Sequence, residues 1–227
     1  MKRILTAFVF TAILFSCKKV DQTKNLTQEP SVIETESIDT ISKEVTKLLK
    51  NIDSDAALIA TALMAAPEKS RSGCKVIGYN MAGDFVTLKE GDIEFICLAD
   101  NPKQNGFNAA CYHKSLEPFM ARGRALRAEG KNEKEIFDIR EAEIKSGKLS
   151  IKDGSTLHIY YGPETLYDPE TSKVAGAQYR YVVYLPWATS ESSGLPEKPN
   201  RPDHPWIMDP GTHRAHIMIT PVPESKN

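Results

Sequence analysis

Three histidines and one aspartate lie close together near the C-terminus of this 227-residue chain. They are His204, Asp209, His213 and His216, in a proline-rich segment and at its exit. Imidazole and carboxylate groups bind zinc and other transition metals, so these residues are a candidate metal site. His213 and His216 would share a face on a helical turn but point to opposite sides of a strand. The alternative is that His213 braces a turn and His216 enters a sheet.

Three further cysteines follow Cys17 in the sequence: Cys74, Cys97 and Cys111. In an exported chain, which the N-terminus described below indicates, an oxidising compartment favours one disulfide and one spare thiol. The preferred pair is Cys97 with Cys111, because the turn residues between them indicate a loop that doubles back. Closing such a loop stabilises a fold by about 3 kcal/mol. Cys74 with Cys97 is the competing pair, if the two lie on neighbouring strands.

Cys111 and His113 would stand side by side on an extended segment, and a Cys–His pair can form a thiolate nucleophile. Catalytic partners of this type normally meet from distant parts of a chain, so a disulfide at Cys111 and a surface position for His113 is the simpler interpretation. The chain has no HExxH motif, no Gly-x-Ser-x-Gly elbow and no phosphate-binding glycine motif. We therefore assign no catalytic residue.

The two tryptophans, Trp187 and Trp206, flank the proline-rich segment of residues 186–210. Aromatic side chains on a rigid loop commonly recognise glycans, peptides or small molecules, so both are candidate ligand-binding residues. The alternative is that they anchor a long segment against the sheet.

The N-terminus has the pattern of a secretory signal peptide. Lys2 and Arg3 precede an apolar run, Ile4 to Phe15, that is too short to span a membrane. Leu14-Phe15-Ser16-Cys17 resembles the lipobox of bacterial lipoproteins. The resemblance implies that residues 1–16 are removed and that Cys17 carries acyl chains such as palmitate. Two or more such chains would hold the protein stably at a membrane of the bacterial cell envelope, facing the periplasm or the exterior.

The elements that must position these residues indicate an α+β fold with a mainly antiparallel sheet and with N-terminal and mid-chain helices. Residues 17–36 have the composition of a tether, and residues 37–227 are expected to form a single globular domain. Residue spacing and capping patterns predict helices over 38–52, 56–66, 115–129 and 132–147. Strands are predicted over 74–79, 85–89 and 93–98 (as an antiparallel meander), 156–161, 178–185 and 215–220. The prolines of 186–210 argue against regular structure there.

Composition narrows the class of partner. Apolar residues make up 41% of the chain, enough for a core, and removing residues 1–16 takes the formal net charge from −1 to −3. An acidic chain offers no basic field to displace counterions, so nucleic acid is not an expected partner.

Two stretches resemble a group of uncharacterised exported bacterial proteins. They are Leu88 to Leu98 with Cys111, and Pro205 to Thr212 followed by His216 to Ile219. The resemblance implies a single domain and transfers no activity. The leading hypothesis is a lipid-anchored envelope protein that binds a small molecule, glycan or protein. The alternative is a metal-dependent hydrolase that uses His204, His213 and His216.

Overall fold

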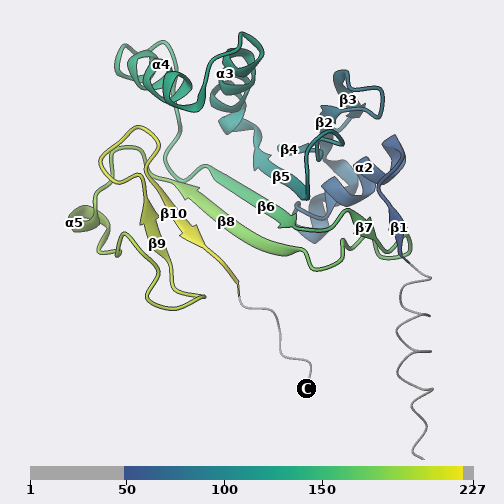
Figure 1. Cartoon of the computed structure of the whole chain (residues 1–227). Coiled ribbons are helices and arrows are strands. Elements are labelled where there is room, and N and C mark those ends of the chain that lie inside the picture. The colour runs from purple at the N-terminus through teal and green to yellow at the C-terminus, as the bar shows by residue number, and fades with distance from the viewer. Residues whose placement is uncertain (1–48, 222–227) are drawn as a thin grey trace, which may run out of the picture.

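The computed structural model describes residues 49–221. The predicted signal peptide, the predicted lipidation site at Cys17 and the predicted tether of residues 17–36 lie outside these residues. An eight-stranded sheet has the order β3-β2-β4-β5-β6-β8-β10-β9, and a second, two-stranded sheet pairs β1 with β7. This mainly antiparallel sheet with helices confirms the α+β class (Figure 1). The strands are β1 Lys50–Asn51, β2 Lys75–Tyr79, β3 Phe85–Lys89, β4 Phe95–Leu98, β5 Phe107–His113, β6 Thr156–Gly162, β7 Leu166–Tyr167, β8 Gln178–Tyr184, β9 Trp206–Met208 and β10 His216–Ile219.

The central strands are buried on both faces, so each face of the sheet has its own core. Successive side chains of a strand point to opposite sides. Cys97 of β4 and Cys111 of β5 belong to one core cluster, together with Leu58 of helix α2. Ile96 and Tyr112, their neighbours in sequence, belong to the other cluster. Helices therefore cover opposite faces of the sheet, at different ends of it (Figure 1).

Helix α2, Asp55–Leu63, covers the face at the β2–β4–β5 end. The Ser54 side chain accepts a hydrogen bond from the Ala57 N–H at 3.2 Å, which caps a helix whose first N–H groups have no partner within it. Leu58 and Ala62 are completely buried. The helix prediction from Ala56 to Ala66 is thus confirmed, although the helix ends at Leu63.

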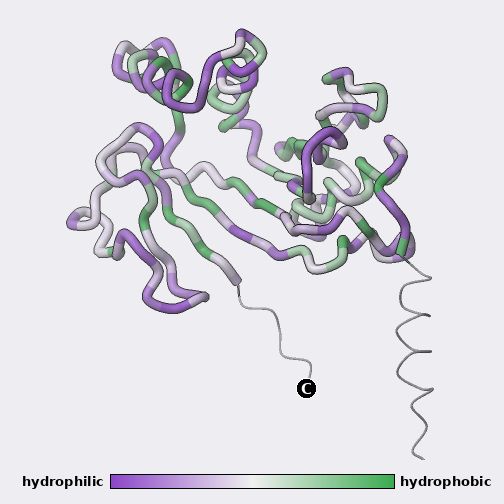
Figure 2. Tube along the Cα trace, viewed as in Figure 1, coloured by the Kyte–Doolittle hydropathy of each residue, from purple (hydrophilic) through white to green (hydrophobic). Residues whose placement is uncertain are grey.

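Helices α3, Glu117–Ala128, and α4, Glu133–Lys145, cover the opposite face. A short 3-10 turn, Lys114–Leu116, leads into α3. The predicted capping box between Asn132 and Glu135 is present at the start of α4. Leu116 and Phe119 enter the core on this face, while much of the outer surface of the two helices is hydrophilic (Figure 2).

Three sequence predictions were wrong in detail. The predicted helix over 38–52 falls mostly outside the described residues, and its end is strand β1, paired with β7 through Lys50 and Tyr167. The strands β2, β3 and β4 are not a meander, because β2 pairs with β4 in parallel and lies between β3 and β4. The proline-rich segment contains a short helix, α5 Ser190–Ser193, and strand β9, which fits between Pro205 and Pro210.

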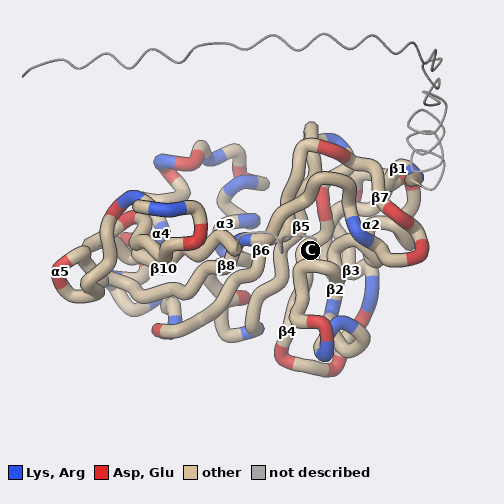
Figure 3. Tube along the Cα trace, turned by 90° about the horizontal axis from the view of Figure 1, so that it is seen from below, with Lys and Arg blue, Asp and Glu red and all other residues tan. Residues whose placement is uncertain are grey.

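The described part of the chain has no large region of purely acidic or purely basic residues (Figure 3). Basic and acidic residues are interspersed over the described part of the chain (Figure 3). Within residues 49–221, no helix combines the length and the apolar character that crossing a membrane requires.

Candidate functional site

Cys74, Cys97 and Cys111 form a buried thiol cluster in the core beneath α2. Cys97 and Cys111 are directly opposite each other on β4 and β5, and Cys74 immediately precedes β2, the parallel neighbour of β4. The three sulfur atoms all lie within 4.8 Å of one another, and none of the three residues is exposed. Among the described residues, this is the one group of three or more His, Cys, Asp or Glu side chains that could share a metal ion.

Strand register explains why two of the thiols are so close. The Lys114 N–H donates to the Glu94 carbonyl at 2.7 Å, which makes Glu94 and Lys114 a hydrogen-bonded pair. Hydrogen-bonded and non-hydrogen-bonded pairs alternate along an antiparallel ladder, so Cys97 and Cys111 are a non-hydrogen-bonded pair. Side chains approach most closely in pairs of this kind.

The cluster favours protonated thiols when no ion is bound. A hydrogen bond with Cys97, together with burial, raises the pKa of the Cys74 thiol above its ordinary value. A hydrogen bond with Cys111 and burial raise the pKa of Cys97, while its contact with Cys74 opposes the rise. The Cys74 thiol also lies 3.1 Å from the Ser70 carbonyl, to which it donates. A metal ion would therefore have to displace protons to bind here.

A cation stands at the edge of the cluster. The Lys89 Nζ donates to the carbonyl oxygens of Ser72 at 2.8 Å and of Cys74 at 2.9 Å, and its charge lowers the pKa values of Cys74 and Cys97. Lys89 thus opposes the effect of burial and would partly balance the negative charge of bound thiolates.

The predicted disulfide between Cys97 and Cys111 is not formed, since all three cysteines are free thiols in the structure. The segment between them does double back, as predicted, and places them opposite each other. Cys74, assigned from the sequence as the spare thiol, instead joins them. The sequence indicated that Cys74 lies at the start of a strand. It did not indicate that this strand, β2, pairs in parallel with β4, which is what brings Cys74 to the other two thiols.

His204, Asp209, His213 and His216 do not gather into a metal site. His204 is exposed in a loop, and Asp209 forms an ion pair with Arg214 at 2.8 Å. His216 enters β10, where its Nδ1 lies 2.7 Å from the Arg214 carbonyl. The predicted metal site is therefore wrong, because the turn after Pro210 sends these side chains to different surroundings.

His213 is instead a fully buried brace between the C-terminal segment and α4. Its Nδ1 lies 3.2 Å from Glu141 Oε2, and its ring packs edge-on against Phe137 at 4.6 Å between centroids. Burial lowers the pKa of His213, and the hydrogen bond with Glu141 opposes this shift. A neutral ring with Nδ1 protonated would donate to Glu141, which is the bracing role considered from the sequence.

The remaining candidate residues from the sequence, His113 and the two tryptophans, lie in different surroundings. His113 lies on the same face of β5 as Cys111, but its Nδ1 accepts from the Ser115 N–H at 3.1 Å and its Nε2 lies 3.8 Å from Glu94. Trp206 packs against the core beneath α3, as an anchor would. Trp187 is 41% exposed, and Lys145 lies 5.5 Å from the centre of its ring.

A second candidate site lies on the other face of the sheet, in a groove of about 330 Å³ beneath α3 and α4. Its charged wall consists of Arg124, Arg127, Arg140 and Arg214 and of one carboxylate, Glu133, which is paired with Arg127. Sequence reasoning did not identify this groove. The missed signal is the position of Arg140, which lies four residues from both Ile136 and Ile144 and so falls within the apolar stripe of α4.

Comparison with protein-family models, with curated proteins and with solved structures finds no match for this chain. The assignment of function therefore depends on the geometry of these two sites.

Proposed function

We propose that this chain is an envelope protein, anchored by lipid on Cys17, whose domain binds a thiophilic transition metal ion at Cys74, Cys97 and Cys111. Zinc is the first candidate ion. The observation that carries the proposal is the convergence of three buried sulfur atoms within 4.8 Å of one another. Thiolate sulfur is a preferred ligand of zinc and of copper(I), and the ligands of one zinc ion must lie about 2.3 Å from it.

A zinc ion needs a fourth ligand, and we propose His158 as the nitrogen donor. His158 of β6 is directly opposite Cys111, so the two side chains share a face. Burial lowers the pKa of His158, which favours the neutral, metal-binding form, and a hydrogen bond with the Ala65 carbonyl opposes this shift. A histidine that binds zinc through one ring nitrogen commonly donates its other N–H to a backbone carbonyl, a role that the Ala65 carbonyl could fill, whereas copper(I) could use the three thiolates alone.

Protons oppose metal binding, because burial and mutual hydrogen bonds raise the pKa values of Cys74 and Cys97. If two protons leave when the ion binds, the apparent affinity falls about a hundred-fold for each unit by which the pH is lowered. Bound metal would also stabilise the fold, since the three ligands come from distant segments of the chain.

The test uses the unlipidated mature chain, residues 17–227 with Cys17→Ser, so that the three clustered cysteines are its only thiols. Zinc and copper(I) are added under reducing conditions, and the bound metal is measured by mass spectrometry and by competition with a chelator. We expect one ion per chain, lost in Cys97→Ser and Cys111→Ser and kept in His204→Ala, an exposed residue of the discarded histidine site. Cobalt(II) should give sulfur-to-metal charge-transfer bands and a tetrahedral spectrum that His158→Ala abolishes.

Two results would refute the metal proposal. One is fully reduced protein that binds none of the three ions. The other is metal that remains bound after the cysteine substitutions. If His158→Ala removes zinc but not copper(I), a three-coordinate thiolate site is indicated. The hydrolase hypothesis is not carried forward, because it depended on histidines that do not come together.

The anchor has a separate test. Expressed in a bacterial host with labelled palmitate, the full chain should incorporate label and enter the membrane fraction. Cys17→Ala should abolish both, and Cys74→Ala should abolish neither. Label incorporated by the Cys17→Ala chain would contradict the lipid assignment.

A further inference from the structure

The groove beneath α3 and α4 has an apolar floor built from the sheet. Side chains that share one face of four strands line it: Leu157, Ile159, Val182, Tyr184, Met208, His216 and Met218. Met120 and Phe119 of α3 close it from above. Methionine side chains are unbranched and polarizable, and they adapt to apolar ligands of different shape. A volume of about 330 Å³ is at the lower end of the range for small-molecule sites, about 300–1,000 Å³.

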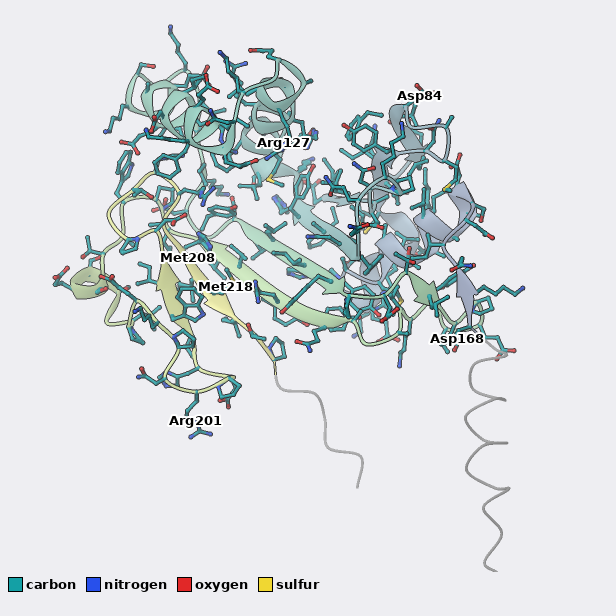
Figure 4. The ribbon with its side chains drawn as sticks, viewed as in Figure 1. Asp84, Arg127, Asp168, Arg201, Met208 and Met218 are labelled. Carbon is teal, nitrogen blue, oxygen red and sulfur yellow. The ribbon has the colours of Figure 1, made fainter. Side chains whose placement is uncertain are left out.

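Four arginines surround this floor, and three of them already have carboxylate partners. Arg124 lies 2.5 Å from Glu117, Arg127 lies 2.6 Å from Glu133, and Arg214 lies 2.8 Å from Asp209. Arg127 stands on α3 across the groove from Met208 and Met218 on β9 and β10 (Figure 4). His216 also lines the groove, and burial lowers its pKa.

Arg140 differs from the other three. It is only 7% exposed, it forms none of the salt bridges found among the described residues, and its Nε has no hydrogen-bond partner. Its guanidinium carbon lies 3.9 Å from the centre of the Phe119 ring, and Nη1 donates to the Phe119 carbonyl at 3.4 Å. A buried guanidinium without an anion is costly, and burial accordingly lowers the pKa of Arg140 to about 10.

The neighbouring helix makes room for this guanidinium. Gly123 lies in the interior of α3, where glycine is a poorer helix former than alanine. A Cβ at this position would lie 2.9 Å from Arg140 Nη1. Glycine here therefore leaves space for a charged side chain that has no protein anion to bind.

We propose that this groove binds a small amphipathic carboxylate, with its head on Arg140 and its apolar body on the floor formed by Val182, Met208 and Met218. A carboxylate accepts two parallel hydrogen bonds from a guanidinium, and the match is strongest where water is excluded. The unpartnered Arg140 supplies the charge complementarity, and the apolar sheet face supplies the rest of the binding surface. This site lies on the opposite face of the sheet from the thiol cluster and does not depend on the metal proposal.

Isothermal titration of the unlipidated mature chain tests the proposal with three probes. Decanoate has both the charge and the apolar body, acetate has the charge alone, and decanol has the apolar body alone. We expect one decanoate site, with at least ten-fold weaker binding of acetate and of decanol. Arg140→Met should weaken decanoate binding about ten-fold or more, since a hydrogen-bonded charge pair is lost. Arg201→Met, which removes an exposed arginine outside the groove that is paired with Asp203, should change it by less than about three-fold.

Gly123→Ala provides a second variant that keeps the charge. The added methyl group must displace the guanidinium, so decanoate binding should weaken while decanol binding stays unchanged. Wild-type protein that does not bind decanoate would overturn the proposal. Equal binding of decanoate by wild type and Arg140→Met would overturn the role of Arg140, provided that a denaturation curve shows the variant to be folded.

Discussion

Replacing Arg140 with methionine should make the protein more stable, although the substitution removes a residue from a packed groove. Burial lowers the pKa of Arg140 to about 10, well below its ordinary value, and each pKa unit corresponds to about 1.4 kcal/mol. Keeping the side chain charged at neutral pH therefore costs on the order of 3 kcal/mol. Methionine fills a similar unbranched space and is a comparably good helix former.

Two contacts of Arg140 reduce the expected gain. The cation–π contact with Phe119, at 3.9 Å, contributes about 0.5–2 kcal/mol, and the long hydrogen bond to the Phe119 carbonyl contributes about 0.5 kcal/mol. The net effect of Arg140→Met is an increase of about 1 kcal/mol in the free energy of unfolding, or about 2–4 °C in the melting temperature for a chain of this size. Urea denaturation at pH 7, followed by tryptophan fluorescence, measures it.

The linkage to pH has a definite sign. The folded pKa lies below the unfolded one, so wild-type stability rises as the pH increases above about 10, and the full cost of the charge is present at neutral pH. Arg127→Met is the matched control, because its exposed ion pair with Glu133 should contribute less than about 0.5 kcal/mol. A loss of more than about 1 kcal/mol in Arg140→Met, with an unchanged denaturant slope, would refute the reasoning.

Three other substitutions test the fold. Gly91→Ala should destabilise by about 2 kcal/mol in urea denaturation, because its Cβ would lie 2.2 Å from the Lys75 backbone nitrogen; a neutral effect would contradict the packing of the β3–β4 connection. Burial raises the pKa of Asp100 to about 6, although the Asn108 N–H, at 2.9 Å, opposes the rise. The free energy of unfolding of the wild type should therefore fall by up to about 3 kcal/mol as the pH increases from about 4 to 6, and Asp100→Asn should remove this fall. If the free energies of unfolding of the two proteins change in parallel with pH, burial does not raise the pKa of Asp100. Ser54→Ala should cost about 1 kcal/mol by circular dichroism melting, as loss of the α2 cap, with Ser54→Gly costing only a few tenths.

Capping residues and prolines near the helix ends made the helices predictable. Ser54 or Asp55 before an apolar run and Pro67 after it predicted α2, although the helix ends at Leu63, and the capping box from Asn132 to Glu135 predicted the start of α4. These signals act within a few residues, so they can be identified without knowing the rest of the fold. Strands β2, β3, β4, β6, β8 and β10 were predictable for the same reason, since alternation and turn residues are local features. Strands β1, β7, β9 and the central β5, which carries Cys111, were not predicted.

The arrangement of the strands depended on information that short segments do not contain. Nothing within residues 93–98 specifies that β4 pairs with β2 in parallel rather than with β3, yet this pairing brings Cys74 to the other two thiols. The histidines failed as a metal site for a related reason. Closeness in sequence does not orient rings, and His213 and His216 are directed by different neighbours, Glu141 on α4 and the Arg214 carbonyl.

The two outer strands of the large sheet bear on how this protein behaves when crowded. Strand β9 has three residues between Pro205 and Pro210, and proline cannot extend a ladder of hydrogen bonds. On the other edge, β3 holds an extra residue, Leu88, where its pairing with β2 shifts, and such a bulge twists the edge strand. Short, proline-bounded and bulged edges resist the addition of strands from neighbouring molecules. If the proposed anchor at Cys17 holds the protein at a membrane surface, it would meet its own copies at high local density, where these two edges would hinder polymerisation through the sheet.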